Sequence, residues 1–320
     1  MVAICAGQVR TWVSRMTGNK EISVAVIGLG SMGLGMARSL LRAGHAVSGY
    51  DLDEAANAAL VAAGGRAGND PADAAGGTSI VVIVVVNAAQ TETALLGHGG
   101  VLSVLAAGSV VISSATMDPR AARALAVRCA ERGVHYLDAP MSGGASRAGT
   151  GELTFMASGT PEAFVAAKPA FDAMAGKVHN LGTEPGIGAS FKIVNQLLAG
   201  VHIAAACEAI TFASRLGLDI AKVYEVITGS AGNSWMFENR VPHILAGDYS
   251  PRSAVDIFTK DLGIVSDIGR SEKFPLPIAA SALQMFLMTA AAGMGKDDDS
   301  SVARLIAQIT GIDLPKAKKA

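Results

Sequence analysis

Three polar residues, Lys192, Asn195 and Gln196, interrupt the apolar stretch GASFKIVNQLLAG at 188–200. Residues spaced i, i+3 and i+4 share one face of a helix, so the ammonium and the two amides could hold one substrate oxygen between them. A lysine buried beside apolar groups such as Phe191 would have its pKa lowered toward neutrality, and it could then take up and return a proton. The alternative is structural, because most lysines at such positions lay their methylenes on apolar surface and keep the charge in water.

A glycine-rich turn near the start of the sequence predicts binding of a dinucleotide. VAVIGLGSMGLGMARSL carries the pattern G-x-G-x-x-G between a β-branched run and a helical pattern. The first glycine permits a tight turn, the second lets a pyrophosphate approach the backbone, and the third lets helix and strand pack closely. The diphosphate would then bind the amides at the start of the helix. The predicted cofactor contacts in this turn are Gly28, Leu29, Gly30, Ser31, Met32 and Gly33.

Polar residues at the ends of three predicted strands complete the predicted cofactor site. Asp51 ends the strand after the glycine turn, where an acid can bind the adenosine ribose. It would repel a 2′-phosphate and no arginine follows it closely, so NAD is favoured over NADP. Asn87 and Thr116 follow two later strands, at the edge where such sheets bind ligands. Both could equally be ordinary turn formers.

The elements that must position these residues form two halves. Up to about residue 181, short β-branched runs alternate with helical patterns such as 31–43 and 118–132, which end at Gly44 and Gly133. The run from Ile80 to Val86 is unbroken Val/Ile, as in a strand buried on both faces. This pattern predicts an α/β fold with a doubly wound parallel sheet. The predicted strands are ISVAVIGLG, HAVSGYDLD, TSIVVIVVVN, GSVVISSAT and GVHYLDAP.

After residue 185 strand signals vanish and helical patterns follow one another. We therefore predict a Rossmann-type NAD-binding domain at 21–185 and an all-helical substrate and dimerisation domain at 186–320. Residues 1–20 carry no acid but several basic residues, and we expect a disordered or over-extended N-terminus rather than a transit peptide. The helix beginning near residue 190 is apolar around most of its circumference, which predicts a homodimer or homotetramer. Its polar residues argue against a membrane span.

Composition narrows the function further. The net charge of −1 gives no footprint for nucleic acid or an anionic membrane. The three cysteines are odd in number and far apart, which suits a reducing cytoplasm without disulfides. No histidine or cysteine pattern predicts a metal site. The acidic run at 297–299 lacks the spacing of a calcium loop and is expected to be a solvated helix start.

Four motifs together resemble the β-hydroxyacid dehydrogenase family, which includes 3-hydroxyisobutyrate dehydrogenase and tartronate semialdehyde reductase. The resemblance runs from about Ile22 to about residue 313. Within the family, several local sequences are most similar to the L-threonate dehydrogenase branch: QLLAGVHIAA, AGNSWMFENR and GKDDDS. The four motifs are GLGSMGLGMA (28–37), DAPMSGG (138–144), GIGASFKIVNQ (186–196) and FTKDLGIV (258–265).

The resemblance implies roles for individual residues. Lys192 would be the catalytic acid/base and Asn195 a substrate ligand, and Lys260 would reach the cofactor end of the site. The family commonly has a second Asn where this chain has Gln196, which leaves a substrate contact there in doubt. The turn Ser142-Gly143-Gly144 would bind the substrate carboxylate, and its exposed amides suit an anion. A hydrolase interpretation of Ser142 fails, because Pro140 stands where G-x-S-x-G needs glycine.

The neighbouring motif AGNSWMFENR offers further candidates at the substrate end, Ser234, Trp235 and Phe237, although a Trp/Phe pair in a helical domain is more often core. The sequence thus predicts an NAD-dependent dehydrogenase of a small polyhydroxylated acid, with L-threonate as the implied substrate. The alternative substrates are 3-hydroxyisobutyrate and tartronate semialdehyde. The alternative to an enzyme is a catalytically inactive family member that acts as a binding module. Such members lack the lysine and add basic segments, whereas this chain has Lys192 and no basic tract.

Overall fold

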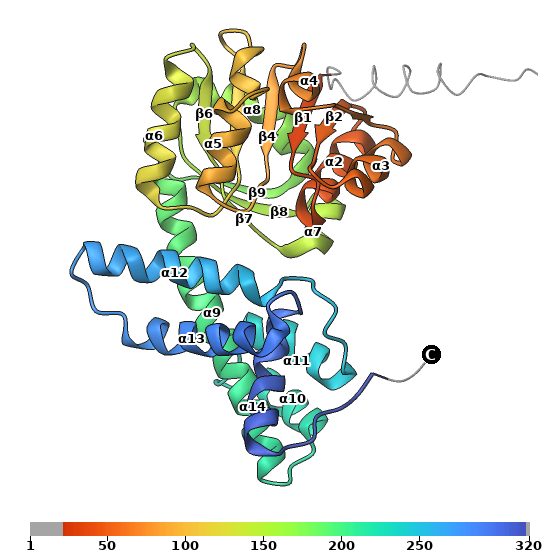
Figure 1. Ribbon diagram of the computed structural model, residues 1–320, viewed down its shortest axis with the longest axis vertical. Helices are drawn as coiled ribbons and strands as arrows, with labels where there is room; N and C mark the ends of the chain where they lie inside the picture. The colour runs from red at the N-terminus through yellow and green to blue at the C-terminus, as the bar shows by residue number, and fades with distance from the viewer. Residues whose placement is uncertain (1–21, 318–320) are drawn as a thin grey trace, which may run out of the picture. The chain divides into compact units, whose positions relative to one another are not determined.

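The computed structural model describes residues 22–317 of the chain (Figure 1). The predicted extension at 1–20 lies outside the described residues. The chain divides into two compact units, one ending at Lys192 and one beginning at Ile193, and each is described by itself. The long helix α9 (Ile187–Arg215) contributes its first residues to one unit and the rest to the other. The domain boundary predicted at residue 185 stays a prediction.

The first unit is built on a parallel sheet whose strand order, among the described residues, is β3-β2-β1-β4-β5-β6. This is the doubly wound arrangement that the alternation of strand and helix patterns predicts, so the predicted fold class is confirmed. The strands are β1 (Ser23–Ile27), β2 (Ala46–Tyr50), β3 (Arg66–Ala67), β4 (Ile80–Ile83), β5 (Val110–Ser113) and β6 (His135–Asp138). The helices are α2 (Ser31–Arg42), α3 (Glu54–Ala62), α4 (Pro71–Ala75), α5 (Ala88–Leu96), the 3-10 helix η1 (Val101–Ser103), α6 (Pro119–Ala130), α7 (Gly144–Thr150) and α8 (Pro161–Met174).

Strand β4 shows how the sheet is buried on both faces. Ile80 and Val82 belong to one hydrophobic core and Val81 and Ile83 to a second, because successive side chains point to opposite faces. The strand ends at Ile83, so its predicted extension to Val86 is wrong: residues 84–86 turn toward α5, and Val86 is exposed. An unbroken apolar run marks a buried strand but does not show where pairing stops.

A second, three-stranded sheet was not predicted. It consists of β7 (Met141–Ser142), β8 (Leu153–Ala157) and β9 (Ala175–Asn180), in the order β7-β8-β9. Strand β8 buries every second residue, which is the signature of a half-covered strand, and β7 pairs with it in antiparallel register. This small sheet continues from the end of β6 and holds the DAPMSGG turn in place.

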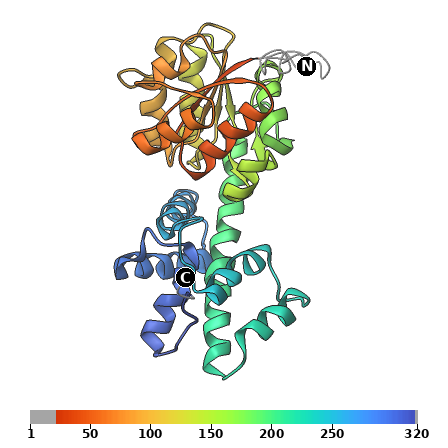
Figure 2. The same ribbon diagram turned by 90° about the vertical axis from the view of Figure 1, so that its right-hand side faces the viewer.

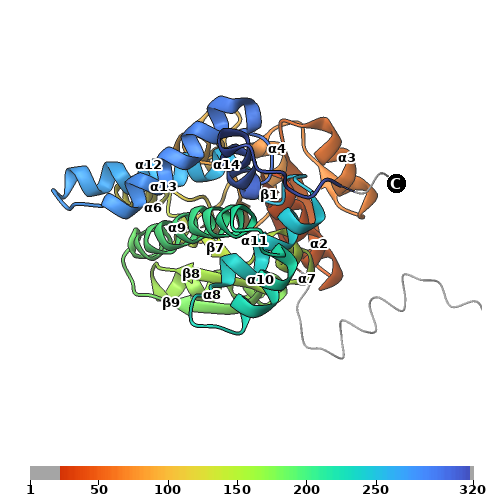
Figure 3. The same ribbon diagram turned by 90° about the horizontal axis from the view of Figure 1, so that it is seen from below.

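The second unit is helical throughout its described part, as the sequence predicts. Its helices gather around the C-terminal part of α9, with α12 and α13 side by side (Figures 2 and 3). They enclose one apolar core that includes Ile203, Phe258 and Phe286. Besides α9, its helices are α10 (Ile220–Thr228), α11 (Trp235–Ala246), α12 (Val255–Ser271), α13 (Pro277–Thr289), the π turn η2 (Ala290–Met294), the 3-10 helix η3 (Asp299–Ser301) and α14 (Val302–Thr310).

The prediction that the acidic run at 297–299 is a solvated helix start is wrong for Asp298 and Asp299, whereas the side chain of Asp297 is 40% exposed. Asp298 and Asp299 are fully buried. Asp299 accepts two hydrogen bonds from the Arg240 guanidinium, at 2.6 and 3.0 Å, and Asp298 lies 2.9 Å from the imidazole of His243. Asp298 also caps η3, so the predicted helix start is present but is formed by a buried ionic cluster that ties η3 to α11. A single sequence cannot show these partners because they lie more than fifty residues away.

By length and composition alone, two segments within residues 22–317 could cross a membrane: α9 and Pro277–Met294. This is weak evidence, because the core helix of a soluble protein passes the same test. Half of the apolar window in α9 is buried within the protein, and the helix carries Lys192 among its apolar residues. A charged group at the bilayer centre costs about 2.5 kcal/mol or more.

Candidate active site

The glycine turn between β1 and α2 has the geometry of a diphosphate cradle. Gly28 has φ 92°, and a Cβ on it would lie 2.5 Å from the Val84 carbonyl oxygen. A Cβ on Gly33 would lie 1.8 Å from the Gly28 oxygen, so neither position tolerates a side chain. A Cβ on Gly30 would meet nothing within 4 Å, and no described side chain caps the start of α2. The turn therefore leaves helix amides open to an anion, and it fits the diphosphate of NAD.

Asp51 fastens the same turn from the neighbouring strand. Its Oδ2 accepts a hydrogen bond from the Leu29 amide at 2.6 Å, and its Oδ1 accepts one from the Asp53 amide at 2.9 Å. The carboxylate thus lies beside the glycine turn at the end of β2, the place a ribose occupies in folds of this kind. This arrangement is consistent with the predicted role of Asp51 toward NAD.

Asn87 and Thr116 lie where the sequence placed them, after β4 and β5 at the carboxyl edge of the sheet. The side-chain oxygen of Asn87 accepts a hydrogen bond from the Gln90 amide at 2.9 Å and caps α5. Asn87 is therefore a helix cap, as the structural alternative predicts, and a cofactor contact could use its amide hydrogens or the second lone pair of Oδ1. Thr116 is partly buried in the loop before α6.

The Ser142-Gly143-Gly144 turn joins β7 to α7. Gly143 and Gly144 have φ of 137° and 73°, a conformation that glycine adopts readily and other residues rarely. The described residues provide no side-chain cap for α7, so the first amides of that helix remain unpaired by a cap. Successive amides of this kind form a concave site for an anion, as expected for a carboxylate-binding turn.

Lys192 lies directly beside this turn. Its side chain is only 8% exposed, and Nζ donates a hydrogen bond to the carbonyl oxygen of Met141 at 2.7 Å. The structural alternative required the end of the lysine side chain to extend into water, and it does not. The expected burial of Lys192 is present, although Phe191, one of the apolar neighbours named for it, is itself 53% exposed.

Two side chains that the sequence analysis left without a role hold the start of α9. One oxygen of Asp138 accepts hydrogen bonds from the amides of Gly186 and Ala189, at 2.9 and 2.7 Å. The Ser158 hydroxyl accepts one from the Gly188 amide at 3.0 Å. Burial raises the pKa of Asp138 to about 6 although these amides lower it. The only sequence signal was an acid at the end of a buried strand, in DAPMSGG.

The glycines of GIGASFK permit this close seating of the helix. Gly186 has φ 93°. A Cβ on Gly188 would lie 2.4 Å from the Met156 carbonyl oxygen and 2.5 Å from that of Asp138, both backbone atoms. Only glycine lets α9 approach β6 and β8 this closely, so the motif explains how the lysine four residues later reaches Met141.

In the second unit, a chain of contacts runs from Asn195 to Lys260. The Asn195 amide donates to Gln196 Oε1 at 3.0 Å, and Gln196 Nε2 donates to Asp261 Oδ2 at 2.5 Å. Asp261 is 1% exposed, and its other oxygen lies 2.6 Å from Lys260 Nζ. Lys260 is thus paired with the acid next to it in sequence, and its contact with the cofactor stays a prediction.

The other candidates divide between the interior and the surface. Ser234 caps α11 by accepting from the Phe237 amide at 3.0 Å. Of the Trp/Phe pair that could equally belong to the core, Phe237 is buried there, whereas Trp235 is 50% exposed. Among the described residues no cluster of His, Cys, Asp or Glu could hold a metal ion. Cys129 and Cys207 are free and buried, and burial raises the pKa of the Cys129 thiol to about 12.

Comparison with known proteins agrees over both units. Residues 23–182 match the family model described as the NAD-binding domain of 6-phosphogluconate dehydrogenase. Residues 186–306 match the family model described as NAD-binding of NADP-dependent 3-hydroxyisobutyrate dehydrogenase. L-threonate dehydrogenase of Cupriavidus necator is 53% identical over 92% of this chain and 98% of its own length. The Escherichia coli K12 enzyme of that name is 47% identical over 95% of this chain and 100% of its own length. A crystal structure of 3-hydroxyisobutyrate dehydrogenase from Salmonella typhimurium superposes with a TM-score of 0.85, at 48% identity over 89% of this chain and 100% of that one.

Proposed function

The chain belongs to the β-hydroxyacid dehydrogenase family and is an NAD-dependent dehydrogenase, and on this premise we propose that it oxidises L-threonate to 2-oxo-tetronate (2-dehydro-L-erythronate), with Lys192 as the acid/base. The observation that carries the proposal is the buried Lys192 side chain, whose Nζ donates a hydrogen bond to Met141, next to the turn that begins at Ser142. Five curated relatives named L-threonate dehydrogenase, at 47 to 53% identity, support the substrate.

The proposed reaction removes a hydride from a carbinol carbon and a proton from its hydroxyl. Bound NAD supplies the hydride acceptor. Neutral Lys192 has two N–H groups and one lone pair; one N–H donates to Met141, which orients the lone pair for the substrate hydroxyl. Lys192 takes that proton as the C–O bond gains double-bond character, and it returns the proton in the reverse direction.

We assign the remaining binding roles as follows. The amides of Gly143 and Gly144 and the Ser142 hydroxyl hold the substrate carboxylate. Asn195, one turn after Lys192 on α9, holds a hydroxyl group, with Gln196 next to it. On the cofactor side, the residues assigned to NAD are Gly28, Leu29, Gly30, Ser31, Met32, Gly33, Asp51, Asn87, Thr116 and Lys260.

A substrate screen tests this proposal. NADH formation is followed with the purified enzyme and NAD over L-threonate, D-threonate, the erythronates and 3-hydroxyisobutyrate, and NADH consumption with tartronate semialdehyde. We expect the highest kcat/KM with L-threonate. A higher kcat/KM with 3-hydroxyisobutyrate or tartronate semialdehyde would transfer the assignment to that substrate.

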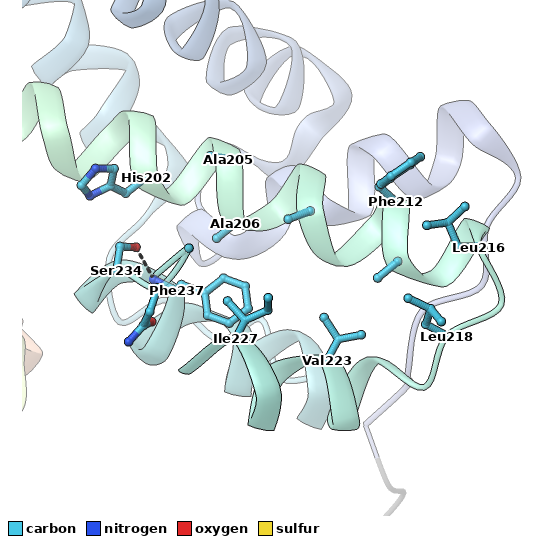
Figure 4. A pocket seen from close by; sticks show the side chains of 14 residues that line it. His202, Ala205, Ala206, Phe212, Leu216, Leu218, Val223, Ile227, Ser234 and Phe237 are labelled. Atoms are coloured by element: carbon cyan, nitrogen blue, oxygen red, sulfur yellow. Dashed lines mark hydrogen bonds between the residues drawn. The ribbon is translucent and has the colours of Figure 1, made fainter. Parts of the chain in front are cut away.

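We also propose that the second unit packs against another copy of the chain. Large apolar side chains stay exposed on one side of α9 and directly after its end: Val194, Leu198, Phe212 and Leu216 are 49 to 62% exposed. Beside Phe212, a cavity of about 520 Å³ opens between α9, α10 and α11, and its wall is mostly apolar (Figure 4). Exposed apolar surface of this extent is typical of a protein interface. A homodimer or homotetramer would cover it.

A cytoplasmic location is proposed as well, since both described cysteines are free, as in proteins of reducing compartments. A sugar acid as substrate would give the enzyme a place in carbohydrate metabolism. The proposed partners are thus the small hydroxy acid, NAD and a second copy of the chain.

A further inference from the structure

We propose that Asp261 is a positioning residue that acts through Gln196: it fixes the amide of Asn195 so that an oxygen, rather than an NH2 group, is presented to the substrate. The enzyme would then select an acid with a second hydroxyl group. This inference rests on the proposed function, because it assumes that Asn195 faces the substrate.

The orientation of the chain starts at the buried carboxylate. Asp261 Oδ1 is paired with the Lys260 ammonium at 2.6 Å, so its other oxygen, Oδ2, can only accept hydrogen bonds. Gln196 must therefore turn its NH2 group toward Asp261, which it contacts at 2.5 Å. Its oxygen then faces Asn195, and the Asn195 NH2 group must donate to it, at 3.0 Å. Each amide is fixed by the one before it.

The consequence for the substrate follows from the geometry of a carboxamide. Its oxygen and nitrogen lie on opposite sides, so an Asn195 whose NH2 group is held by Gln196 presents Oδ1 on the other side. A carbonyl oxygen accepts a hydrogen bond from a hydroxyl group, and it gains nothing from a methyl or methylene group. Asn195 is only partly buried, and it follows Lys192 by three residues on the same helix.

The departure of this chain from the family pattern has a physical reason in this arrangement. Gln196 is 7% exposed, and both ends of its amide are engaged by other side chains. An asparagine at 196 is one methylene shorter and would not span from α9 to Asp261 on α12 at the same backbone separation. The longer side chain is what connects Asn195 to the buried acid, and Gln196 supports the substrate ligand instead of serving as one.

Two variants test the orientation. In Asp261→Asn, the single amide oxygen is drawn to the Lys260 ammonium, so residue 261 offers NH2 to Gln196 and the whole chain of amides inverts. In the double variant Asp261→Asn with Gln196→Glu, the carboxylate at 196 accepts from both neighbours, and Asn195 recovers its original orientation. Asp267→Asn is the matched control: it removes one acid from the exposed side of α12.

The first readout is kcat/KM for L-threonate and for its 3-deoxy and 4-deoxy analogues. We expect the wild type and Asp267→Asn to prefer L-threonate over at least one analogue by about 10- to 100-fold, the scale of leaving one polar group in the site without its hydrogen bond. Asp261→Asn should reduce this preference to a few-fold, and the double variant should restore it. An unchanged preference in folded Asp261→Asn, or no preference in the wild type, would overturn the inference.

The second readout does not depend on the substrate. The side-chain amide signals of Asn195 and Gln196 are followed by ¹H–¹⁵N NMR in the NAD-bound enzyme. Both should shift in Asp261→Asn, although Asn195 does not touch residue 261. In the double variant residue 196 has no side-chain amide, and the Asn195 signal should return to its wild-type position. An Asn195 signal that stays in place refutes the relay. If the wild type instead does not oxidise L-threonate at all, the proposed substrate fails while the amide signals still decide on the relay.

Discussion

Replacing Gly188 by alanine tests how the seating of α9 governs the lysine. The added Cβ would lie 2.4 Å from the Met156 oxygen and 2.5 Å from the Asp138 oxygen. Real Cβ atoms keep at least 3.0 Å from such atoms, so the start of the helix has to move by several tenths of an ångström to about 1 Å. Neither contact can relax cheaply, because both oxygens belong to the backbone of paired strands.

The displacement moves Lys192, which lies one turn further along α9, away from Met141. A misplacement of about 1 Å at a reacting group can cost about 100-fold in rate. We expect kcat/KM of Gly188→Ala to fall by about 30- to 100-fold, with a loss of about 1–3 kcal/mol in the free energy of unfolding from overpacking.

The assay is NADH formation with L-threonate, together with NAD binding and thermal unfolding. Gly149→Ala is the matched control, because a Cβ there would meet nothing within 4 Å. NAD affinity should be unchanged in both variants, since the glycine turn after β1 is not touched. A folded Gly188→Ala with kcat/KM within threefold of the wild type would refute this account of the helix anchor.

Three further predictions concern the cofactor, pH and assembly. NAD should be used at least tenfold more efficiently than NADP, and Asp51→Ala should narrow the ratio; equal wild-type efficiencies would contradict the role of Asp51. Asp138 has a pKa of about 6 in the folded protein against an ordinary 3.8, so the folded state keeps a proton that the unfolded chain releases. The contribution of Asp138 to the free energy of unfolding should therefore be fully present below pH 4 and decrease by about 3 kcal/mol as the pH rises through 6. In urea titrations the difference in free energy of unfolding between the wild type and Asp138→Asn should change by this amount over that range; a difference that does not change with pH would exclude this contribution. Phe212→Glu should shift the mass in light scattering from an oligomer to a monomer, and a monomeric wild type at micromolar concentration would refute the interface.

The fold was predictable wherever a local pattern carries the information. Buried parallel strands such as β4 read as β-branched runs, and the glycine turn carries a spacing that the backbone geometry requires. The second sheet was missed because β7 has two residues and β9 buries none of its six. Such strands have no periodic signal to read.

The site was predictable as a set of candidate residues but not as a set of contacts. Lys192 stood out because a lysine in an apolar helix needs a reason. Its partner Met141 is fifty-one residues earlier, and Asp261 is sixty-five residues after Gln196. Pairings over such distances depend on how the elements pack, which the spacing of residues in one chain does not encode. The same reason hid Asp138, whose role depends on the amides of α9.

The most direct test of the account is kcat of Lys192→Arg at saturating NAD and L-threonate, compared with the wild type and with Lys192→Ala. Arginine keeps the charge and the apolar stem, but it cannot give up its proton near neutral pH. If Lys192 is the acid/base, kcat of both variants should fall by at least about 100-fold while NAD affinity stays the same. An arginine variant with near-normal kcat would contradict the assignment of Lys192 and, with it, the mechanism proposed for this enzyme.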